Sequence, residues 1–387
     1  MAVDLVVRCL RGTEWIVASE VDGALRPERI DLAPRQVSVT VPDLTPGVLD
    51  LRTVDDAFLV VGTTPDPGHT KDVPPRLAAE IGAADWGSAL DRLRAVRAVP
   101  CRPVFDVVAN FVGRRNFNRY TLEDRIGAEL TPVLGGTYVS HNPVQRSGGT
   151  PQGTDLTVRI MFGEGIATIT LRVAGRPLHR RAYKRHTGPG TLHPPLAAAL
   201  ARLAGPSAGE TVLDPFCGDG TCAIEAYAQC PDAAILAADV SAERVANARA
   251  NARAFGAEVE VTEQDAGRLP FPDGEIDVIV TNPPWNLAVD AGGTLTRSLL
   301  PFWRRLSRLL SDTGRVCVVV DREQDAPAVL RDLDYPLTVS VPIRLAGRLC
   351  DIVLAAPPGR EPASLSPELR AWLDRARAAG VVHEQGF

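Results

Sequence analysis

The feature that most constrains the fold is a regular alternation of strand-like and helix-like segments that begins after Gly205. The strand-like runs are 211–214, 233–240, 258–264, 276–282 and 314–321, and the helix-like segments are 221–230, 241–256 and 294–310. Apolar strands that alternate with helices form a parallel sheet covered on both faces. The pattern therefore predicts an α/β, doubly wound, Rossmann-like domain. The last two runs, 337–345 and 348–357, are expected to pair as an antiparallel edge.

Length and composition are those of a soluble globular protein with two or three domains. The chain has 387 residues, of which 45% are hydrophobic and 23% charged. The first fifteen residues carry Asp4, Arg8, Arg11 and Glu14, and no stretch approaches the roughly 18 apolar residues of a membrane span. We therefore expect a cytoplasmic protein without membrane contact. The seven cysteines show no C-x-x-C spacing, which argues against disulfides and against a metal site.

The first strand of the predicted sheet runs into the segment DPFCGDGT, residues 214–221. Ligands of doubly wound sheets bind at the carboxyl ends of strands, and glycines let the backbone approach them closely. Aspartates also end or follow the next two strands, where they could bind ribose hydroxyls and an adenine amino group or serve only as turn residues. The predicted cofactor-binding residues are Asp214, Phe216, Cys217, Gly218, Gly220, Thr221, Asp239, Val240, Asp265 and Ala266. The turn lacks G-x-G-x-x-G, which argues against a dinucleotide.

The segment TNPPWN, residues 281–286, follows the fourth strand and suits chemistry on an exocyclic amine. Such an amine is a poor nucleophile because its lone pair is delocalised into the ring. The Asn282 side-chain carbonyl and the Pro283 backbone carbonyl could accept its hydrogens and localise the lone pair, while Trp285 offers a face for base stacking. The alternative is a structural turn with a buried tryptophan. The predicted catalytic residues are Asn282, Pro283 and Trp285.

Asn-Pro-Pro-aromatic after the fourth strand resembles the signature of class I amino-group methyltransferases. Its combination with DPFCGDGT is similar to the branch that acts on RNA and DNA. The resemblance implies S-adenosylmethionine as the cofactor. The methyl transfer itself needs no metal ion. Asp219 stands where that family usually has serine, Trp285 where it has tyrosine, and Asn286 where it has glycine. The adjoining segment 286–293 could close over the substrate or be an ordinary loop.

The middle of the chain is basic although the whole protein carries a formal net charge of −5. Residues 101–190 contain thirteen basic and six acidic residues, which suits either a phosphate-binding surface or a solvated arginine-rich one. The pattern there predicts a strand, a helix at 122–134 with Thr121 as N-cap, and a strand pair. This order of a strand, a helix and a strand pair fits a small RNA-binding module. Near the N-terminus, Thr13 is expected to cap another helix.

The segment 172–200 resembles the junction of THUMP-containing RNA methyltransferases, where a basic G-x-P-L-H-x-R-x-Y precedes the catalytic domain. Its matching positions are Gly175, Pro177, Leu178, His179, Arg181 and Tyr183. The resemblance implies the following division: an α+β, ferredoxin-like region 1–100, a THUMP-like RNA-binding domain 101–175, a linker 176–205, a methyltransferase domain 206–357 and a C-terminal helix 358–387. The candidate RNA-binding residues are Arg114, Arg115, Arg119, His179, Arg180, Arg181, Lys184 and Arg185.

Within that family, the motif resembles enzymes that methylate the exocyclic N2 of guanosine in tRNA. The alternatives are guanine N2 in ribosomal RNA, adenine N6 in RNA or DNA, and the amide of a protein glutamine. His179 and Arg181 could contact RNA or anchor the linker, and His186 and His193 are read as linker residues rather than catalysts.

Overall fold

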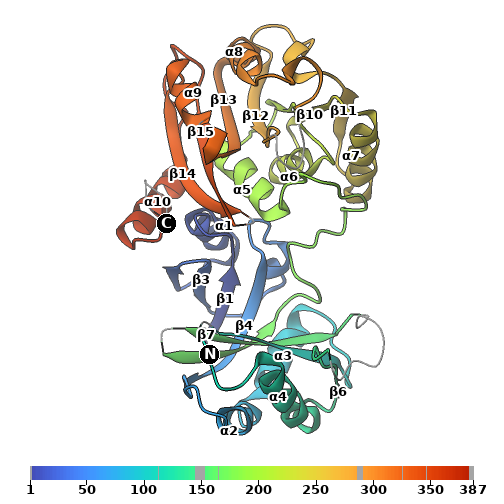
Figure 1. The fold of residues 1–387 in the computed structure, drawn as a ribbon, viewed down its shortest axis with the longest axis vertical. Coiled ribbons are helices and arrows are strands. Elements are labelled where there is room, and N and C mark those ends of the chain that lie inside the picture. The colour runs from blue at the N-terminus through green and yellow to red at the C-terminus, as the bar shows by residue number, and fades with distance from the viewer. Residues whose placement is uncertain are drawn as a thin grey trace.

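The structure is a computed structural model that describes residues 2–111, 113–143, 153–163, 165–285, 291–324, 326–345 and 347–382. Two β-sheets follow one another along the long axis of the molecule, and the helix α1 lies between them (Figure 1). Buried apolar residues of both halves form one continuous cluster. None of the described helices is long and apolar enough to cross a bilayer.

The first sheet has eight strands in the order β2-β3-β1-β4-β8-β7-β5-β6. They are β1 (Val3–Arg8), β2 (Arg29–Ala33), β3 (Gln36–Val41), β4 (Asp56–Pro65), β5 (Val104–Asn110), β6 (Thr137–Tyr138), β7 (Leu156–Gly163) and β8 (Ile166–Arg172). Alternate residues of β3 are buried, as a strand with one covered face requires. Because β4 pairs with β8, strands from 1–100 and from 101–175 form one sheet.

Four helices belong to this half: α1 (Glu14–Leu25), α2 (Val73–Gly82), α3 (Trp86–Val96) and α4 (Arg119–Leu134). The expectation that Thr121 caps α4 is wrong. Asn118 is the cap, because its Oδ1 accepts the Thr121 N–H at 2.8 Å and starts the helix earlier. Thr13 does precede α1, but its hydroxyl donates to the Leu10 carbonyl rather than capping the helix.

The second sheet has seven strands in the order β11-β10-β9-β12-β13-β15-β14. They are β9 (Thr211–Asp214), β10 (Ala234–Asp239), β11 (Val259–Glu263), β12 (Ile276–Thr281), β13 (Leu310–Asp321), β14 (Leu337–Leu345) and β15 (Arg348–Ala355). The first five pair in parallel, and β15 and β14 add an antiparallel edge. The predicted mostly parallel, Rossmann-like α/β sheet is therefore confirmed.

The helices of this half are α5 (Pro194–Ala204), α6 (Thr221–Gln229), α7 (Ala242–Phe255), α8 (Leu300–Leu309), α9 (Ala326–Asp332) and α10 (Pro367–Ala378). The prediction of a single helix over 294–310 is wrong in its bounds. A 3₁₀ turn, η3 (Gly293–Leu295), comes first, and α8 begins only at Leu300 with Pro301 in its first turn, where a missing N–H is harmless. The C-terminal helix α10 packs against α1, as Figure 1 shows, and Ser19 donates to Glu368 Oε1 at 2.9 Å.

Candidate active site

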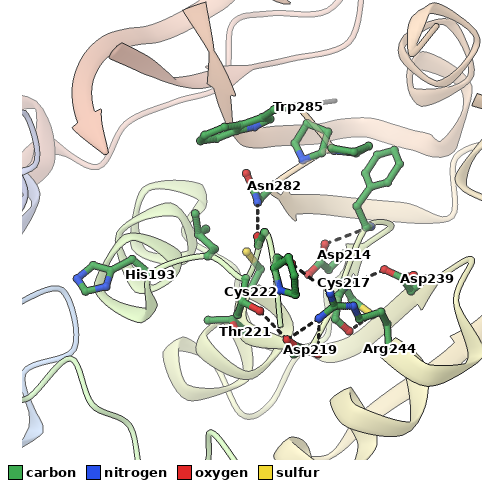
Figure 2. A pocket seen from close by; sticks show the side chains of 18 of the residues that line it. His193, Asp214, Cys217, Asp219, Thr221, Cys222, Asp239, Arg244, Asn282 and Trp285 are labelled. Carbon is green, nitrogen blue, oxygen red and sulfur yellow. Dashed lines mark hydrogen bonds and ion pairs between the residues drawn. The ribbon is translucent and has the colours of Figure 1, made fainter. Parts of the chain in front are cut away.

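A pocket of about 980 Å³ opens at the carboxyl ends of the parallel strands. It brings together nearly all the residues predicted for the cofactor and for catalysis, several of which are seen in Figure 2. Those that line it are Asp214, Phe216, Cys217, Gly218, Thr221, Asp239, Val240, Asp265, Ala266, Asn282, Pro283 and Trp285. Gly220 does not line it. It is the N-cap of α6 and has a φ of +84°, which favours glycine, and a Cβ there would press on Ala248 of α7.

The turn after β9 and the end of β10 are joined by one carboxylate. The Gly218 N–H donates to Asp239 Oδ2 at 2.9 Å, and the Ser241 N–H donates to Asp239 Oδ1 at 2.9 Å. Gly218 has a φ of +51°, which favours glycine, and a Cβ there would meet no atom within 4 Å. Two backbone bonds thus hold Asp239 at the pocket wall, which suits a group that binds ligand hydroxyls.

Asp214 lies at the floor of the pocket and is 2% exposed. Burial raises the pKa of Asp214 to about 7, although the Thr281 hydroxyl donates to its Oδ1 at 2.6 Å and opposes the shift. The carboxyl therefore changes charge near neutral pH. Thr281 ends β12, so this hydrogen bond also ties the cofactor turn to the strand that carries Asn282.

Asp265 also lines the pocket, and its carboxylate already accepts hydrogen bonds from backbone groups. Its Oδ1 accepts the Gly267 N–H at 2.9 Å, and its Oδ2 accepts the Thr294 N–H at 2.7 Å. Desolvation raises the pKa of Asp265, but these hydrogen bonds outweigh it and leave the pKa below its ordinary value. Asp265 therefore shapes the wall by fixing η3 in place.

Asn282 lies directly after β12, with Trp285 above it in Figure 2. Its Nδ2 donates to the Gly190 carbonyl at 3.4 Å. Its Oδ1 is buried, points towards Trp285, and has no hydrogen-bond partner among the described residues. The indole Nε1 of Trp285 is likewise buried and unpaired within the described part of the chain. A buried acceptor without a hydrogen bond destabilises the folded protein unless a ligand supplies that hydrogen bond. Asn286 and residues 287–290 lie outside the described residues.

No sequence pattern marked residues 186–193, which we call the strap, and residues 189–193 of it line the pocket. Thr191 Oγ1 donates to Asp219 Oδ2 at 2.5 Å, and the Gly188 N–H donates to the same oxygen at 2.7 Å. Burial raises the pKa of Asp219, but the hydrogen bonds from Thr191 and Gly188 contribute to holding it below the ordinary value. The unusual aspartate in the DPFCGDGT turn was the one sequence signal for this arrangement.

Residues from distant parts of the chain also line the pocket, and no local pattern marked them. Arg35 and Asp55 come from the N-terminal half, and Leu345 and Arg348 from the β14–β15 hairpin. His193, read from the sequence as a linker residue, donates from its Nε2 to Asp55 Oδ1 at 2.6 Å. The pocket mouth is therefore built by both halves of the protein.

The candidate RNA-binding residues fall into two groups. Arg114, Arg119, Arg180 and Arg185 are exposed. The other four are half-buried: Arg115 pairs with Asp66 at 2.7 Å, Arg181 with Glu225 at 3.1 Å, His179 contacts the Asp55 carbonyl, and Lys184 lines the pocket. Burial lowers the pKa of Lys184. The structure thus separates solvent-facing cations from cations that join parts of the protein.

The donors and acceptors in the pocket fit S-adenosylmethionine. The Thr221 hydroxyl is buried at the start of α6 without a partner in the described residues, and the free N–H groups of that helix end suit a carboxylate. Asp239 suits ribose hydroxyls. No group of three or more His, Cys, Asp or Glu side chains among the described residues is arranged to hold a metal ion.

Comparisons with known proteins agree with this geometry. A tRNA (guanine(6)-N2)-methyltransferase of Thermus thermophilus is 32% identical over 229 residues, which span 59% of this chain and 64% of that protein. A tRNA (guanine(10)-N2)-dimethyltransferase of Methanothermobacter thermautotrophicus is 31% identical over 144 residues, which span 37% of this chain and 42% of that protein. The matched parts thus cover less than two thirds of each relative.

Structural similarity extends over more of the molecule. The crystal structure of TrmN from Thermus thermophilus superposes with a TM-score of 0.71 at 26% identity, over 92% of this chain and 99% of that one. Residues 181–336 match the family UPF0020, described as the RMKL-like methyltransferase domain. The predicted S-adenosylmethionine-dependent methyltransferase class is confirmed for this part of the chain, since residues 181–336 match the methyltransferase domain of the RMKL-like UPF0020 family.

Proposed function

We propose that this protein methylates the exocyclic N2 of a guanosine in tRNA. The observation that carries the proposal is the buried Oδ1 of Asn282, which faces Trp285 at the end of β12 and has no hydrogen-bond partner in the described part of the chain. It lies in the same pocket as Asp214 and Asp239. An acceptor beside an aromatic face is the arrangement that an exocyclic amine of a stacked base requires. The two relatives named for guanine-N2 methylation of tRNA support the choice of base and RNA.

The chain's own residues account for activation of the amine. Asn282 Oδ1 accepts one amine hydrogen, and the Pro283 carbonyl accepts the other, so the nitrogen lone pair is localised and aimed at its target. Trp285 holds the base by stacking, which contributes about 1–3 kcal/mol. Bound S-adenosylmethionine supplies an electrophilic methyl group on a sulfonium. The proton released from nitrogen passes to solvent, because the methylated amine is acidic before it loses that proton.

Cofactor placement would use the remaining pocket residues. Asp239 would accept the ribose hydroxyls, Gly218 and Thr221 would hold the amino-acid end, and Asp265 and Ala266 would hold the adenine. Holding the two reactants in a fixed relation contributes most of the rate in such a mechanism. In this proposal Asp214 supports the turn from beneath, through Thr281 and the Phe216 N–H.

RNA binding is proposed for the N-terminal half and the linker. The exposed cations Arg114, Arg119, Arg180 and Arg185 are the proposed phosphate contacts, and the half-buried Arg115, His179, Arg181 and Lys184 shape the surface that carries them. We keep the division into a ferredoxin-like region, a THUMP-like domain, a linker and a catalytic domain as part of this proposal. The target base must leave its stack to reach Asn282, at a cost of a few kcal/mol.

The test is methyl transfer to purified nucleic acids and proteins with isotope-labelled S-adenosylmethionine, followed by mass spectrometry of nucleosides and of digested protein. Label in N2-methylguanosine from tRNA is the expected result. Label in N2-methylguanosine from ribosomal RNA alone would overturn the choice of RNA. Label in N6-methyladenosine would overturn the base, and label in a glutamine amide would overturn the substrate class. The Asn282→Ala protein is the matched control, because its pocket keeps every other residue.

A further inference from the structure

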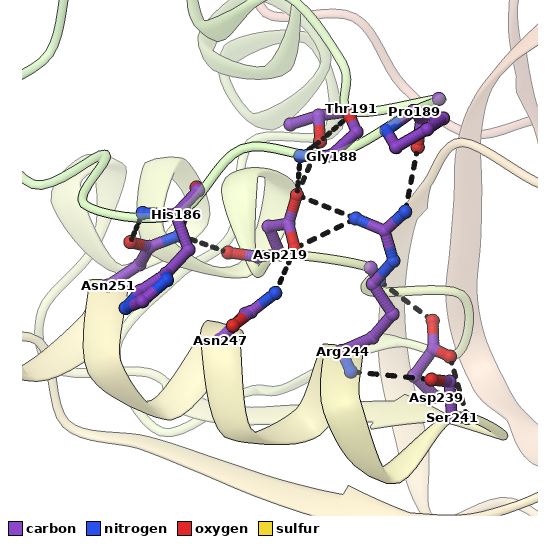
Figure 3. A network of polar contacts seen from close by, with 12 residues as sticks. His186, Gly188, Pro189, Thr191, Asp219, Asp239, Ser241, Arg244, Asn247 and Asn251 are labelled. Carbon is purple, nitrogen blue, oxygen red and sulfur yellow. Dashed lines mark hydrogen bonds and ion pairs between the residues drawn. The ribbon is translucent and has the colours of Figure 1, made fainter.

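The strap is held against the catalytic domain through one buried carboxylate. Asp219 is 1% exposed, and Figure 3 shows it at the centre of a polar network. On the strap side it accepts from Thr191 Oγ1 and from the Gly188 N–H, at 2.5 and 2.7 Å. On the other side it accepts from Arg244 Nη1 at 2.9 Å and from Asn247 Nδ2 at 3.1 Å. Asp219 thus connects the strap to helix α7.

Two residues of α7, Arg244 and Asn251, also bind the strap directly. Arg244 Nη2 donates to the Pro189 carbonyl at 3.2 Å, and Asn251 Nδ2 donates to the His186 carbonyl at 3.0 Å. Gly188 has no side chain where the guanidinium lies, and a Cβ there would overlap Arg244. The strap is therefore built to pass close to α7, with its backbone oriented by several bonds at once.

This placement controls the orientation of the Asn282 amide. The Gly190 carbonyl can only accept a hydrogen bond, so the side of the amide that faces it must be the NH₂ group. Oδ1 must then face the other way, towards Trp285, as Figure 2 shows. Gly190 has a φ of +74°, a conformation that suits glycine and that points this carbonyl at Asn282. A reversed amide would present hydrogens to the substrate amine and repel it.

We propose that Asp219 is a positioning residue for methyl transfer: by fastening the strap it lets the Gly190 carbonyl fix the Asn282 amide with its oxygen towards the substrate. This inference rests on the function proposed above. Asp219 touches neither the amine nor the reacting methyl group and acts only through Thr191, Gly188 and Gly190. The inference also gives a role to this aspartate, which stands where serine is usual in the family that the sequence resembles.

The test compares Asp219→Asn and Thr191→Val with Asp232→Asn, an exposed aspartate in the turn before β10. We measure kcat and KM for tRNA and for S-adenosylmethionine, and the affinity for S-adenosylhomocysteine. Asp219→Asn and Thr191→Val are expected to lower kcat about 10- to 100-fold, because small misplacements of a reacting group have effects of this size. KM values and the affinity for S-adenosylhomocysteine should change less than about threefold, because the contacts that bind the substrates are kept. Asp232→Asn should match the wild type.

A second arm repeats both substitutions in the Asn282→Asp background. A carboxylate has an oxygen on each branch, so its orientation needs no fixing, and the strap substitutions should lose most of their effect on kcat there. An equal effect in both backgrounds would overturn the inference, as would a change confined to KM. If the Asn282→Asp protein shows no turnover, the kcat and KM values of the strap variants with native Asn282 decide whether the inference holds. Should Asp219→Asn fail to fold, Thr191→Val, which removes the contacts of a single hydroxyl group with Asp219 and Gly188, carries the test alone.

These outcomes are distinct from failure of the proposed function. A wild-type protein that methylates no guanosine N2 overturns the function. A wild-type protein that does so, with strap variants of unchanged kcat, overturns only the role of Asp219.

Discussion

Arg52 Nε lies 2.7 Å from Oε2 of Glu225, so a side chain of the N-terminal half forms an ion pair with helix α6 of the methyltransferase domain. Glu225 is fully buried at its side chain, and it also accepts from Arg181 Nε at 3.1 Å and from the Tyr183 hydroxyl at 2.8 Å. One carboxylate thus joins the N-terminal half, the segment around Arg181 and Tyr183, and helix α6. The pocket mouth depends on this junction, because Arg35 and Asp55 line it from the N-terminal side.

Glu225→Ala is expected to destabilise the protein by about 3–5 kcal/mol, since it leaves two arginines beside a buried site without their counter-charge. The free energy of unfolding from denaturant titration measures this. Glu260→Ala removes an exposed glutamate from β11 and should change the free energy by less than about 0.5 kcal/mol. Equal, small effects of the two substitutions would show that the junction does not hold the halves together.

Asn282→Ala is expected to keep cofactor binding and to lose about 10²- to 10³-fold in kcat, the usual effect of deleting one polar group that acts in the transition state. Its amide is bound to Gly190 on one side only, so its removal leaves the Asp239 side of the pocket unchanged. Calorimetric titration with S-adenosylhomocysteine and single-turnover methylation of tRNA separate the two effects. Methylation at the wild-type rate would refute the amine-acceptor role.

The raised pKa of Asp214 predicts a pH-dependent stability. Between about pH 4, the usual pKa of an aspartate, and pH 7, the folded protein keeps a proton that the unfolded chain has lost. The contribution of Asp214 to stability is therefore full below about pH 4, falls as the pH rises through this window, and levels off above pH 7. Asp214→Asn stays neutral and should lack this fall. Denaturant titrations of both proteins from pH 4.5 to 8 test it, and parallel pH profiles would contradict it.

The exposed cations should act on RNA and the buried ones on stability. Arg185→Ala is expected to weaken tRNA binding and to lower the slope of log affinity against log salt by about one, because one phosphate contact is lost. Arg115→Ala should instead lower the melting temperature, since its guanidinium is 3% exposed, pairs with Asp66 and lies against the Phe162 ring. Arg331→Ala, an exposed change on α9, is the control for both measurements. A melting temperature of the Arg115→Ala protein equal to that of the wild type would contradict this division.

Sequence patterns predicted those elements whose signals are local. The strand 211–214 was predicted with the bounds that β9 has, because an apolar run that ends in a glycine turn leaves little choice of limits. The start of α4 was missed because two residues three positions apart, Asn118 and Thr121, both suit a cap, and the geometry of the preceding chain selects between them. The helix 294–310 was predicted too long because η3 is fixed by Asp265, which lies 29 residues before Thr294 in the chain.

The sequence by itself determined the parallel sheet, the cofactor turn and the Asn-Pro-Pro-Trp segment, since each depends on residues close together in the chain. Only the tertiary structure decided what surrounds them. Asp219 meets Thr191, and Glu225 meets Arg52, across separations of 28 and 173 residues. A buried carboxylate needs partners, but any of the many arginines, threonines and backbone N–H groups could supply them. Which ones do so is set by how the strap and the N-terminal half pack against α6 and α7, and no local pattern records that packing.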